Sequence, residues 1–137
     1  MADDNVNLIG ADGRVLFTFD ELKCPDTHVV RLARGFACAL IELRQGFGKP
    51  MRVNSCCRSA DHNRVIGGHA RSLHVYDHPY HPTGGSCAVD IHCPDNEYAW
   101  NLAYLAMGKG WSVGRGKTFI HLDRRRDFAL PDGFFTY

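Results

Sequence analysis

Histidines cluster in one part of this sequence, close to aspartates on strand-like segments. Five of the eight histidines lie within residues 69–92, namely His69, His74, His78, His81 and His92. Asp90 stands in the run Ala-Val-Asp-Ile, whose alternation predicts a strand with Asp90 facing away from its apolar neighbours. Further along, Phe-Ile-His-Leu-Asp predicts a second strand, with His121 and Asp123 on one face.

Two imidazoles and one carboxylate, held on strands and on a loop beside them, suit an open zinc site. A catalytic zinc takes three protein ligands and leaves one position for water. It lowers the pKa of that water toward about 7 and polarises the scissile carbonyl of a substrate. Asp123 is placed to hold the tautomer of His121, as carboxylates beside ligand imidazoles commonly do. A lone histidine is more often a satisfied polar residue, so it is the combination that indicates metal chemistry.

Several further motifs accompany these residues. They are Asn-Ser-Cys-Cys-Arg-Ser-Ala-Asp-His-Asn at 54–63, Gly-Gly at 67–68, Ser-Leu-His at 72–74, Ala-Val-Asp-Ile at 88–91 and His-Leu-Asp at 121–123. Together they resemble the zinc D-alanyl-D-alanine carboxypeptidase family, which also contains phage L-alanyl-D-glutamate endolysins and is related to the hedgehog signalling domain. The resemblance extends over about residues 17–126.

The resemblance implies a role for each matching residue. His74, Asp90 and His121 take the roles of the Zn²⁺ ligands. Arg58 takes the role of an arginine that grips or polarises the substrate, because a guanidinium can fork onto a peptide carboxylate or carbonyl. The alternative for this arginine is to tie down a turn. The remaining candidates are Asp123, as a further catalytic residue, and Ser72, His78 and His81, as substrate contacts.

The sequence departs from the family pattern S-x-H-x-x-G-x-A-x-D in the spacer between the first two ligands, which here comprises residues 75–89. The extra stretch, approximately Tyr76–Gly84, is expected to bulge near the rim of the cleft. It would act there as a lid or substrate clamp, or it is a solvated loop. It also leaves open that His78 or His81 replaces His74 as a ligand.

Two other departures concern the substrate turn and the general base. Cys56 and Cys57 stand where the family prefers glycine and tyrosine, so that turn can be built differently. Thr118 stands where many members carry a Glu or Asp as general base, and a threonine cannot take a proton from water. The base must then come from elsewhere, or the activity is weak or absent. The candidates within reach are Asp123, His69, His78, His81 and His92.

These patterns predict one α+β domain over residues 1–137. We expect a small antiparallel sheet with flanking helices, and the zinc site in a cleft on the sheet. The predicted elements are helices over 27–44 and 96–107, a short helix from Ala60 capped by Ser59, strands over 51–54 and 87–92, and a hairpin of 111–113 with 119–123.

Composition narrows the range of partners. The net charge of +1 is too small to indicate a nucleic-acid-binding face, and no apolar run approaches the roughly 20 residues that span a membrane. The N-terminus is polar and lacks the apolar core of a secretory signal, so we expect synthesis in the cytoplasm. Most of the six cysteines are then reduced core residues, although export would permit a Cys87–Cys93 disulfide. A monomer is expected.

The sequence therefore predicts a zinc metallopeptidase that hydrolyses amide bonds in peptidoglycan stem peptides. A minimal domain without a signal suits a phage or prophage lytic enzyme, which acts on the cell wall after release or as a virion component. D,D-carboxypeptidase and L,D-endopeptidase activities share the ligand pattern, so the bond cleaved stays open. One alternative is a noncatalytic zinc-bound cell-wall-binding or virion module, and another is a disulfide-rich structural protein without metal.

Overall fold

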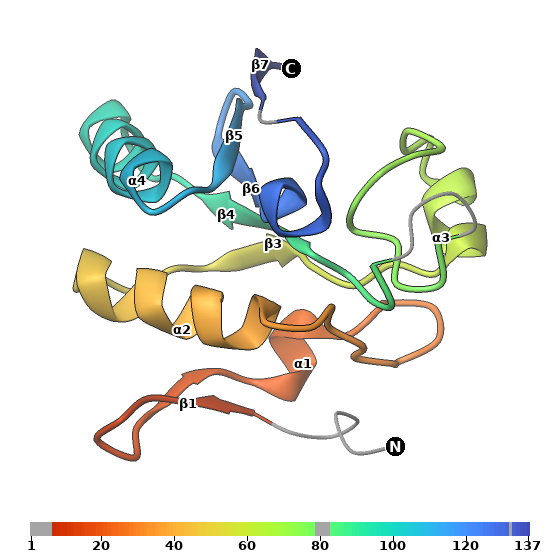
Figure 1. Cartoon of the computed structure of the whole chain (residues 1–137), viewed down its shortest axis with the longest axis horizontal. Coiled ribbons are helices and arrows are strands. Elements are labelled where there is room, and N and C mark those ends of the chain that lie inside the picture. Colours follow the sequence, from red (N-terminus) through yellow and green to blue (C-terminus); the bar gives the residue numbers. More distant parts are fainter. Residues whose placement is uncertain (1–6, 79–82, 132) are drawn as a thin grey trace.

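The protein folds into helices and strands around a central sheet (Figure 1). The structure is a computed structural model that describes residues 7–78, 83–131 and 133–137. The helices are α1 (Phe19–Leu22), α2 (Phe36–Phe47), α3 (Ala60–Val65), α4 (Asn96–Gly108) and the 3-10 helix η1 (Arg125–Phe128). The strands are β1 (Leu8–Ile9), β2 (Val15–Phe17), β3 (Val53–Ser55), β4 (Ala88–His92), β5 (Ser112–Arg115), β6 (Phe119–Asp123) and β7 (Phe134–Thr136).

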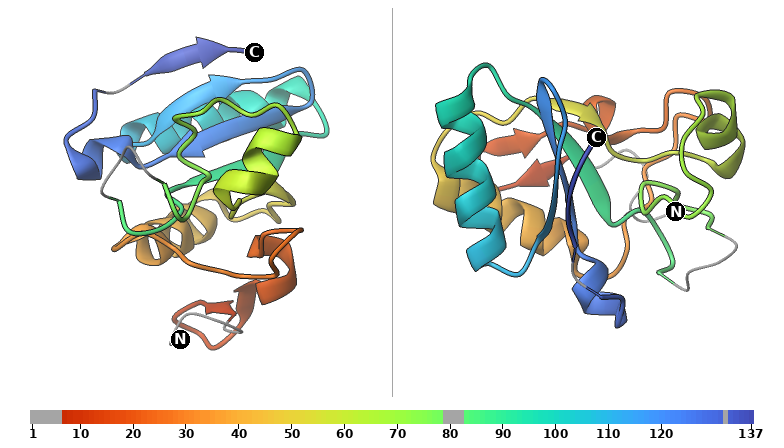
Figure 2. Two further views of the ribbon diagram at one scale, coloured as in Figure 1. Left: turned by 90° about the vertical axis from the view of Figure 1, so that its right-hand side faces the viewer. Right: turned by 90° about the horizontal axis from the view of Figure 1, so that it is seen from above.

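The central sheet has five strands in the order β3-β4-β6-β5-β7, and β1 and β2 form a separate ribbon. All its neighbours are antiparallel except β5 and β7, which are parallel. Views from two further sides show α4 on one side of the sheet and α3 on the other (Figure 2). The predicted α+β class with a small sheet and flanking helices is confirmed, and β7 is an edge strand that the aromatic tail did not reveal.

The core lies where the apolar sides of β4 and β6 meet α2 and α4. Val89 and Ile91 of β4 alternate with polar residues, as do Ile120 and Leu122 of β6, and all four are buried in one cluster. Burial of each such side chain contributes about 1.5–3 kcal/mol. This burial fixes which face of each strand turns inward, and the polar residues between them must face the other way.

Most of the predicted elements are present at nearly the predicted positions. The hydroxyl of Ser59 accepts the His62 amide at 3.0 Å and caps α3, as predicted. Asp95 caps α4 in the same manner, through the Tyr98 amide at 2.8 Å. A capping side chain satisfies an amide that the first turn leaves without a partner, which contributes about 1 kcal/mol.

The helix predicted over residues 27–44 begins later, at Phe36, so the prediction is wrong for its first part. Ser86 exchanges two backbone hydrogen bonds of 2.8 Å with this segment, which holds the chain extended there. Gly35, at a φ of 82°, then turns the chain into α2. Ala33 is buried although it precedes the helix, so an apolar residue that packs into the core from extended chain continued the helix-like spacing.

The six cysteines all carry free thiols, and five of them are buried. Cys87 and Cys93, the pair considered for a disulfide, lie just before β4 and just after it. Burial raises the pKa of Cys87 to about 12, so its thiol stays protonated and packs as a small apolar group. In the described part of the chain, no helix has the length and apolar character that crossing a bilayer requires.

Candidate metal centre

A row of residues crosses the central sheet on the face opposite the core. Paired in register across the five strands, they are Ser55, Asp90, His121, Gly114 and Phe135, in that order. Residues directly opposite one another in a sheet project to the same side. The alternation that buries the apolar residues therefore also brings one carboxylate and one imidazole together at the centre of the sheet.

His74 reaches the same place from the loop that follows α3. The amide of Arg58 donates to the carbonyl of His74 at 3.0 Å, and the amide of Cys87 donates to the carbonyl of Leu73 at 2.9 Å. These bonds tie the loop both to the turn after β3 and to the start of β4. The imidazole of His74 consequently lies against the sheet, with its ring 5.2 Å from that of His121.

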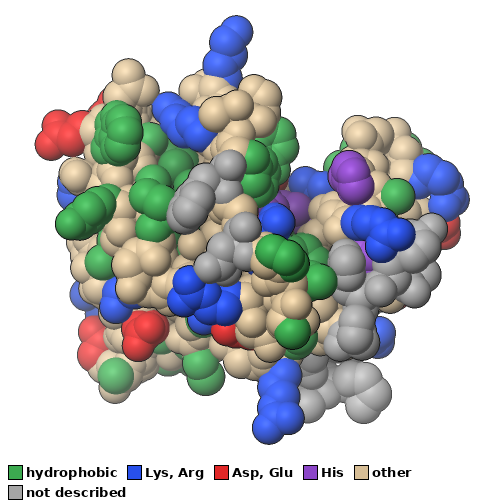
Figure 3. Space-filling model, turned by 45° about the horizontal axis from the view of Figure 1, so that its top comes forward, with side chains coloured by type: hydrophobic (Ala, Val, Ile, Leu, Met, Phe, Trp, Pro, Cys, Tyr) green, Lys and Arg blue, Asp and Glu red, His purple; other side chains and the backbone are tan. Residues whose placement is uncertain are grey.

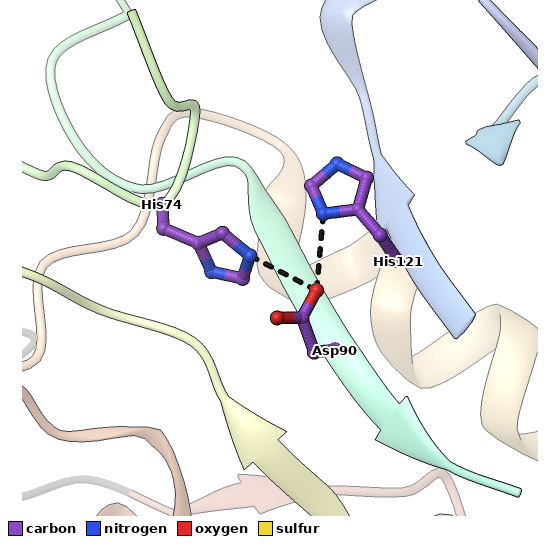
Figure 4. A group of neighbouring side chains, drawn as sticks. All are labelled: His74, Asp90 and His121. Atoms are coloured by element: carbon purple, nitrogen blue, oxygen red, sulfur yellow. Dashed lines mark hydrogen bonds and ion pairs between the residues drawn. The ribbon is translucent and has the colours of Figure 1, made fainter. Parts of the chain in front are cut away.

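Three side chains converge on one point (Figure 4). His74 Nε2 lies 3.1 Å and His121 Nδ1 lies 3.0 Å from the same carboxylate oxygen, Oδ1 of Asp90. The three ligand atoms all lie within 4.8 Å of one another, and the three residues are buried. Two imidazole nitrogens and one carboxylate oxygen at this spacing form a donor set that can surround a single divalent cation.

The partners of each imidazole assign its tautomer. His74 Nδ1 lies 2.8 Å from the carbonyl oxygen of Cys56, which only accepts hydrogen bonds, so Nδ1 carries the proton. His121 Nε2 lies 2.8 Å from Oδ2 of Asp123, which accepts the proton of Nε2 in the same way. In their neutral forms both imidazoles then direct a lone pair at Asp90. A divalent cation among these donors would use both lone pairs, and without one a proton on His121 Nδ1 can donate to Asp90 instead.

The charges around the centre affect the two imidazoles differently. Burial lowers the pKa of His74 by more than Asp90 raises it, so the neutral imidazole is favoured. Burial acts to raise the pKa of Asp90, but the two histidines outweigh it and hold that pKa well below its usual range. For His121, burial acts to lower the pKa, but its hydrogen bonds to the carboxylates of Asp123 and Asp90 raise it overall, which favours the protonated ring while no metal is bound. The donors present thus fit a zinc ion in type, spacing and charge.

Asp123 is a fully buried carboxylate whose two oxygens are both occupied. Oδ2 faces His121 and accepts Nη2 of Arg125 at 2.7 Å, while Oδ1 accepts the amide and Nε of Arg125 at 3.0 and 2.9 Å. Burial acts to raise its pKa, but Arg125 and His121 lower it to about 2. Asp123 therefore stays ionised and orients His121, as predicted from their positions on one strand face.

A cleft of about 750 Å³ opens over the three side chains. It lies between the lobe that carries α3 and the body of the molecule, and arginine or lysine and histidine side chains gather along it (Figure 3). The predicted location of the site, in a cleft on the sheet, is confirmed. Besides the three converging residues, its lining includes Arg58, Ile66, His69, Ser72, Phe135 and Tyr137.

A comparison with protein families matches residues 17–123 of the chain to the family described as Peptidase M15. The chain belongs to the Peptidase M15 family. M15 peptidases are zinc-dependent, and the converging histidine, aspartate and histidine lie within the matched region. The resemblance found in the sequence is thus confirmed at the level of the family. A comparison with curated proteins found no match.

Arg58 of this M15 peptidase is held by three protein partners. Nε donates to Ser55 at 3.0 Å, Nη1 donates to Asn63 at 3.2 Å, and Nη2 forms an ion pair of 3.5 Å with Oδ2 of Asp90. Burial lowers the pKa of Arg58, and Asp90 opposes that shift. The guanidinium is therefore anchored beside the oxygen of Asp90 that the histidines do not contact, and it faces the cleft as well.

The structure separates the candidates for the general base. Thr118 is exposed in the turn before β6, and neither it nor His92 belongs to the described lining of the cleft. His69 does line the cleft, but its Nδ1 accepts the Arg71 amide at 3.0 Å. The neutral imidazole of His69 then carries its proton on Nε2 and is a donor there. The carboxylates of the described lining are Asp90 and Asp123, and both are already engaged.

The described part of the extra stretch packs away from the cleft of the M15 peptidase. Asp77 accepts the Ala60 amide at 2.8 Å at the start of α3, and the Tyr76 hydroxyl lies 3.1 Å from that of Thr27. His78 is not among the residues that line the cleft. His81 lies outside the described residues.

Sequence reasoning missed two contributors to the centre. One is the carbonyl of Cys56, which orients His74, and a backbone acceptor leaves no trace in residue types. The other is the pair of aromatic residues Phe135 and Tyr137, whose rings lie 5.5 and 6.2 Å from that of His121. The aromatic character of the tail was the available signal, but nothing in it indicated a strand beside β5.

Proposed function

We propose that this protein is a zinc-dependent peptidase that hydrolyses amide bonds in the stem peptides of peptidoglycan. The observation that carries this proposal is the convergence of two imidazole nitrogens on one oxygen of Asp90, inside an open cleft. Membership of the Peptidase M15 family supports it. A buried structural zinc would need no such cleft, because its four positions are filled by the protein.

In this proposal His74, Asp90 and His121 hold the zinc. A zinc ion there lowers the pKa of water and polarises the scissile carbonyl. With a metal bound, the contact of His121 with Asp123 and that of His74 with the Cys56 carbonyl would hold the other nitrogen of each ring toward the ion.

Arg58 and Ser72 are the proposed substrate contacts within the described cleft. Arg58 fixes the second oxygen of Asp90, and its remaining N–H groups are proposed to bind a carboxylate or carbonyl of the peptide. A cleft lined by Arg58 and Arg71 suits the acidic stem peptides of murein. His78 and His81 stay predicted substrate contacts. We further propose a monomer of the phage or prophage lytic type, which meets the wall after release or as part of a virion.

The test is digestion of purified murein, with mass spectrometry of the released fragments. We expect new peptide termini in the presence of zinc, loss of these products with a chelator, and recovery when zinc is restored. The masses identify the bond, which distinguishes a D,D-carboxypeptidase from an L,D-endopeptidase. Identical fragments with and without the chelator would contradict zinc dependence.

A second candidate is a noncatalytic zinc-bound module that binds the cell wall. It is favoured by one observation: both carboxylates in the described lining of the cleft are engaged, so neither is available as a general base. Protein that contains stoichiometric zinc and pulls down with murein, but releases no fragments, would support this candidate over the peptidase.

A further inference from the structure

A hydrogen-bond donor that is not already anchored would complement Arg58 in the described cleft. Amide hydrolysis develops negative charge on the carbonyl oxygen, and a donor directed at that oxygen stabilises the transition state. Each nitrogen of Arg58 already donates to or pairs with a protein oxygen, and Arg125 is committed to Asp123. Both guanidinium groups are therefore held in place, so a second donor to the substrate oxygen would have to come from another segment of the cleft.

Tyr137 lines the cleft and follows, along the chain, the region that matches the family. Its amide donates to the Arg115 carbonyl at 2.9 Å, which extends the pairing of β7 with β5. Its ring lies 5.0 Å from that of Phe119 and 5.6 Å from that of Phe135. The backbone and one side of the ring are therefore fixed by the body of the protein.

A glycine makes this arrangement possible. Gly114 lies between His121 and Phe135 in the register of the sheet. A Cβ at this position would lie only 2.3 Å from Cε2 of Phe135, so the phenyl ring fills the space that a side chain would occupy. Phe135 therefore packs directly against Gly114, and its ring in turn packs against that of Tyr137.

The rest of the tyrosine side chain faces open space. Tyr137 is 69% exposed, yet it lines the cleft together with Arg58, Asp90 and His121. A tyrosine hydroxyl is protonated at neutral pH and both donates and accepts. The ring of Tyr137 is held in place, but its side chain is exposed in the cleft beside three polar residues that are already engaged. Such a position suits contact with a ligand better than packing in a core.

We propose that Tyr137 contacts the substrate and that its hydroxyl donates a hydrogen bond to the oxygen that becomes negatively charged during amide hydrolysis. This inference rests on the proposed function and adds a donor to that site. No covalent bond to Tyr137 forms and its proton is not transferred. His69, on the loop after α3, presents its Nε2 donor from another segment of the cleft lining and is suited to a different part of the peptide.

The test compares Tyr137→Phe and Tyr137→Leu with the unchanged protein. The probe is acetohydroxamate, which presents a charged oxygen beside a carbonyl and requires no knowledge of the bond cleaved. Binding is followed in the absorption spectrum of cobalt-substituted protein, and murein hydrolysis is measured in parallel with the zinc form. Tyr104→Phe is the matched control, because Tyr104 is 80% exposed on α4 and lies outside the cleft.

We expect both Tyr137 variants to bind acetohydroxamate about 10-fold more weakly and to lose a similar factor in kcat/KM, since each lacks the hydroxyl. Metal content and melting temperature should be unchanged in Tyr137→Phe, and Tyr104→Phe should match the parent. Parental affinity in Tyr137→Phe would overturn the proposal, and damage confined to Tyr137→Leu would mean that the ring only packs.

The two proposals can fail separately. If the parent binds cobalt and acetohydroxamate but does not cleave murein, the proposed peptidase function fails while the binding comparison still tests Tyr137. If murein is cleaved equally well by Tyr137→Phe, with unchanged affinity for acetohydroxamate, only the role of Tyr137 fails. A parent protein that binds neither cobalt nor zinc overturns both.

Discussion

Replacing Asp123 by Asn should disturb the metal centre without touching a metal ligand. The substitution keeps the shape of the side chain but exchanges one acceptor oxygen for an NH₂ donor. Arg125 donates two hydrogen bonds to Oδ1 of Asp123 but only one to Oδ2, the oxygen that faces His121. The new NH₂ group therefore displaces fewer donors when it takes the place of Oδ2. There it would donate to Nε2, which forces the imidazole proton onto Nδ1. That proton occupies the position from which His121 is proposed to bind zinc.

Two magnitudes follow from this geometry. Loss of a partner that orients a ligand imidazole typically weakens metal binding about 10- to 100-fold, and a tautomer reversal belongs at the upper end. In the zinc-free protein, the pKa of Asp123 is lowered to about 2, against about 3.9 for a free aspartate. That difference corresponds to roughly 2–3 kcal/mol of stability at neutral pH. Arg125 loses its ionised partner in this variant, but its side chain is partly exposed and water can solvate the charge. We therefore expect the free energy of unfolding to fall by about 3 kcal/mol, or the Tm by roughly 10 °C.

The assay is zinc affinity by competition with a chelator, combined with thermal unfolding of the zinc-free protein. Asp20→Asn is the control, because Asp20 forms an exposed pair of 3.2 Å with Lys23. Such a pair contributes about 0.5 kcal/mol at most, so the control should behave like the parent. A Kd for zinc within twofold of the parent, in a destabilised Asp123→Asn protein, would refute the tautomer assignment.

Three other predictions can be checked with the same preparations. His74→Ala should abolish the rise in Tm on adding zinc, whereas the parent should gain about 2.7 kcal/mol at a free zinc concentration 100 times its Kd; an equal rise in both would exclude this ligand. Gly114→Ala should lower stability by about 2 kcal/mol because its Cβ meets the Phe135 ring at 2.3 Å, while Gly108→Ala, with open space around it, should cost nothing. Burial above all raises the pKa of Tyr98 to about 12. The contribution of its protonated hydroxyl to the free energy of unfolding is therefore intact below the pKa of tyrosine in the unfolded chain, about 10, and is lost as the pH rises to about 12. The absorbance of tyrosinate is titrated in the parent and in Tyr98→Phe, and the difference between the two curves should be centred at about pH 12. A difference centred at about pH 10 would contradict this prediction.

Strand alternation is a local property, so the sequence alone indicates which residues of the candidate metal centre share one face of a strand. His121 and Asp123 lie two positions apart on β6, so their common face follows from the pleat alone. Asp90 is distinguished in the same way from Val89 and Ile91 of β4. The convergence of these strands with His74 came from the resemblance, since spacing within one segment cannot indicate which segments meet.

The features that could not be predicted depend on contacts between distant segments. Arg58 pairs with Asp90 across 32 positions of the chain, and the Cys56 carbonyl orients His74 across 18. The late start of α2 has the same origin, because Ser86 holds the preceding segment extended. A short window of sequence indicates helix or strand propensity and amphipathicity. Both are overridden where backbone hydrogen bonds to a distant segment hold the chain in another conformation.

The core and the metal centre are therefore two consequences of one strand register. Val89 and Leu122 lie opposite each other on the core side, and Asp90 and His121 lie opposite each other on the cleft side. A shift of β4 by one residue would bury the carboxylate and expose the apolar residues, which costs several kcal/mol for each exchanged pair. Apolar burial on one face thus selects the only register that assembles the donors on the other. The core therefore positions the three donors of the candidate metal centre in the metal-free protein.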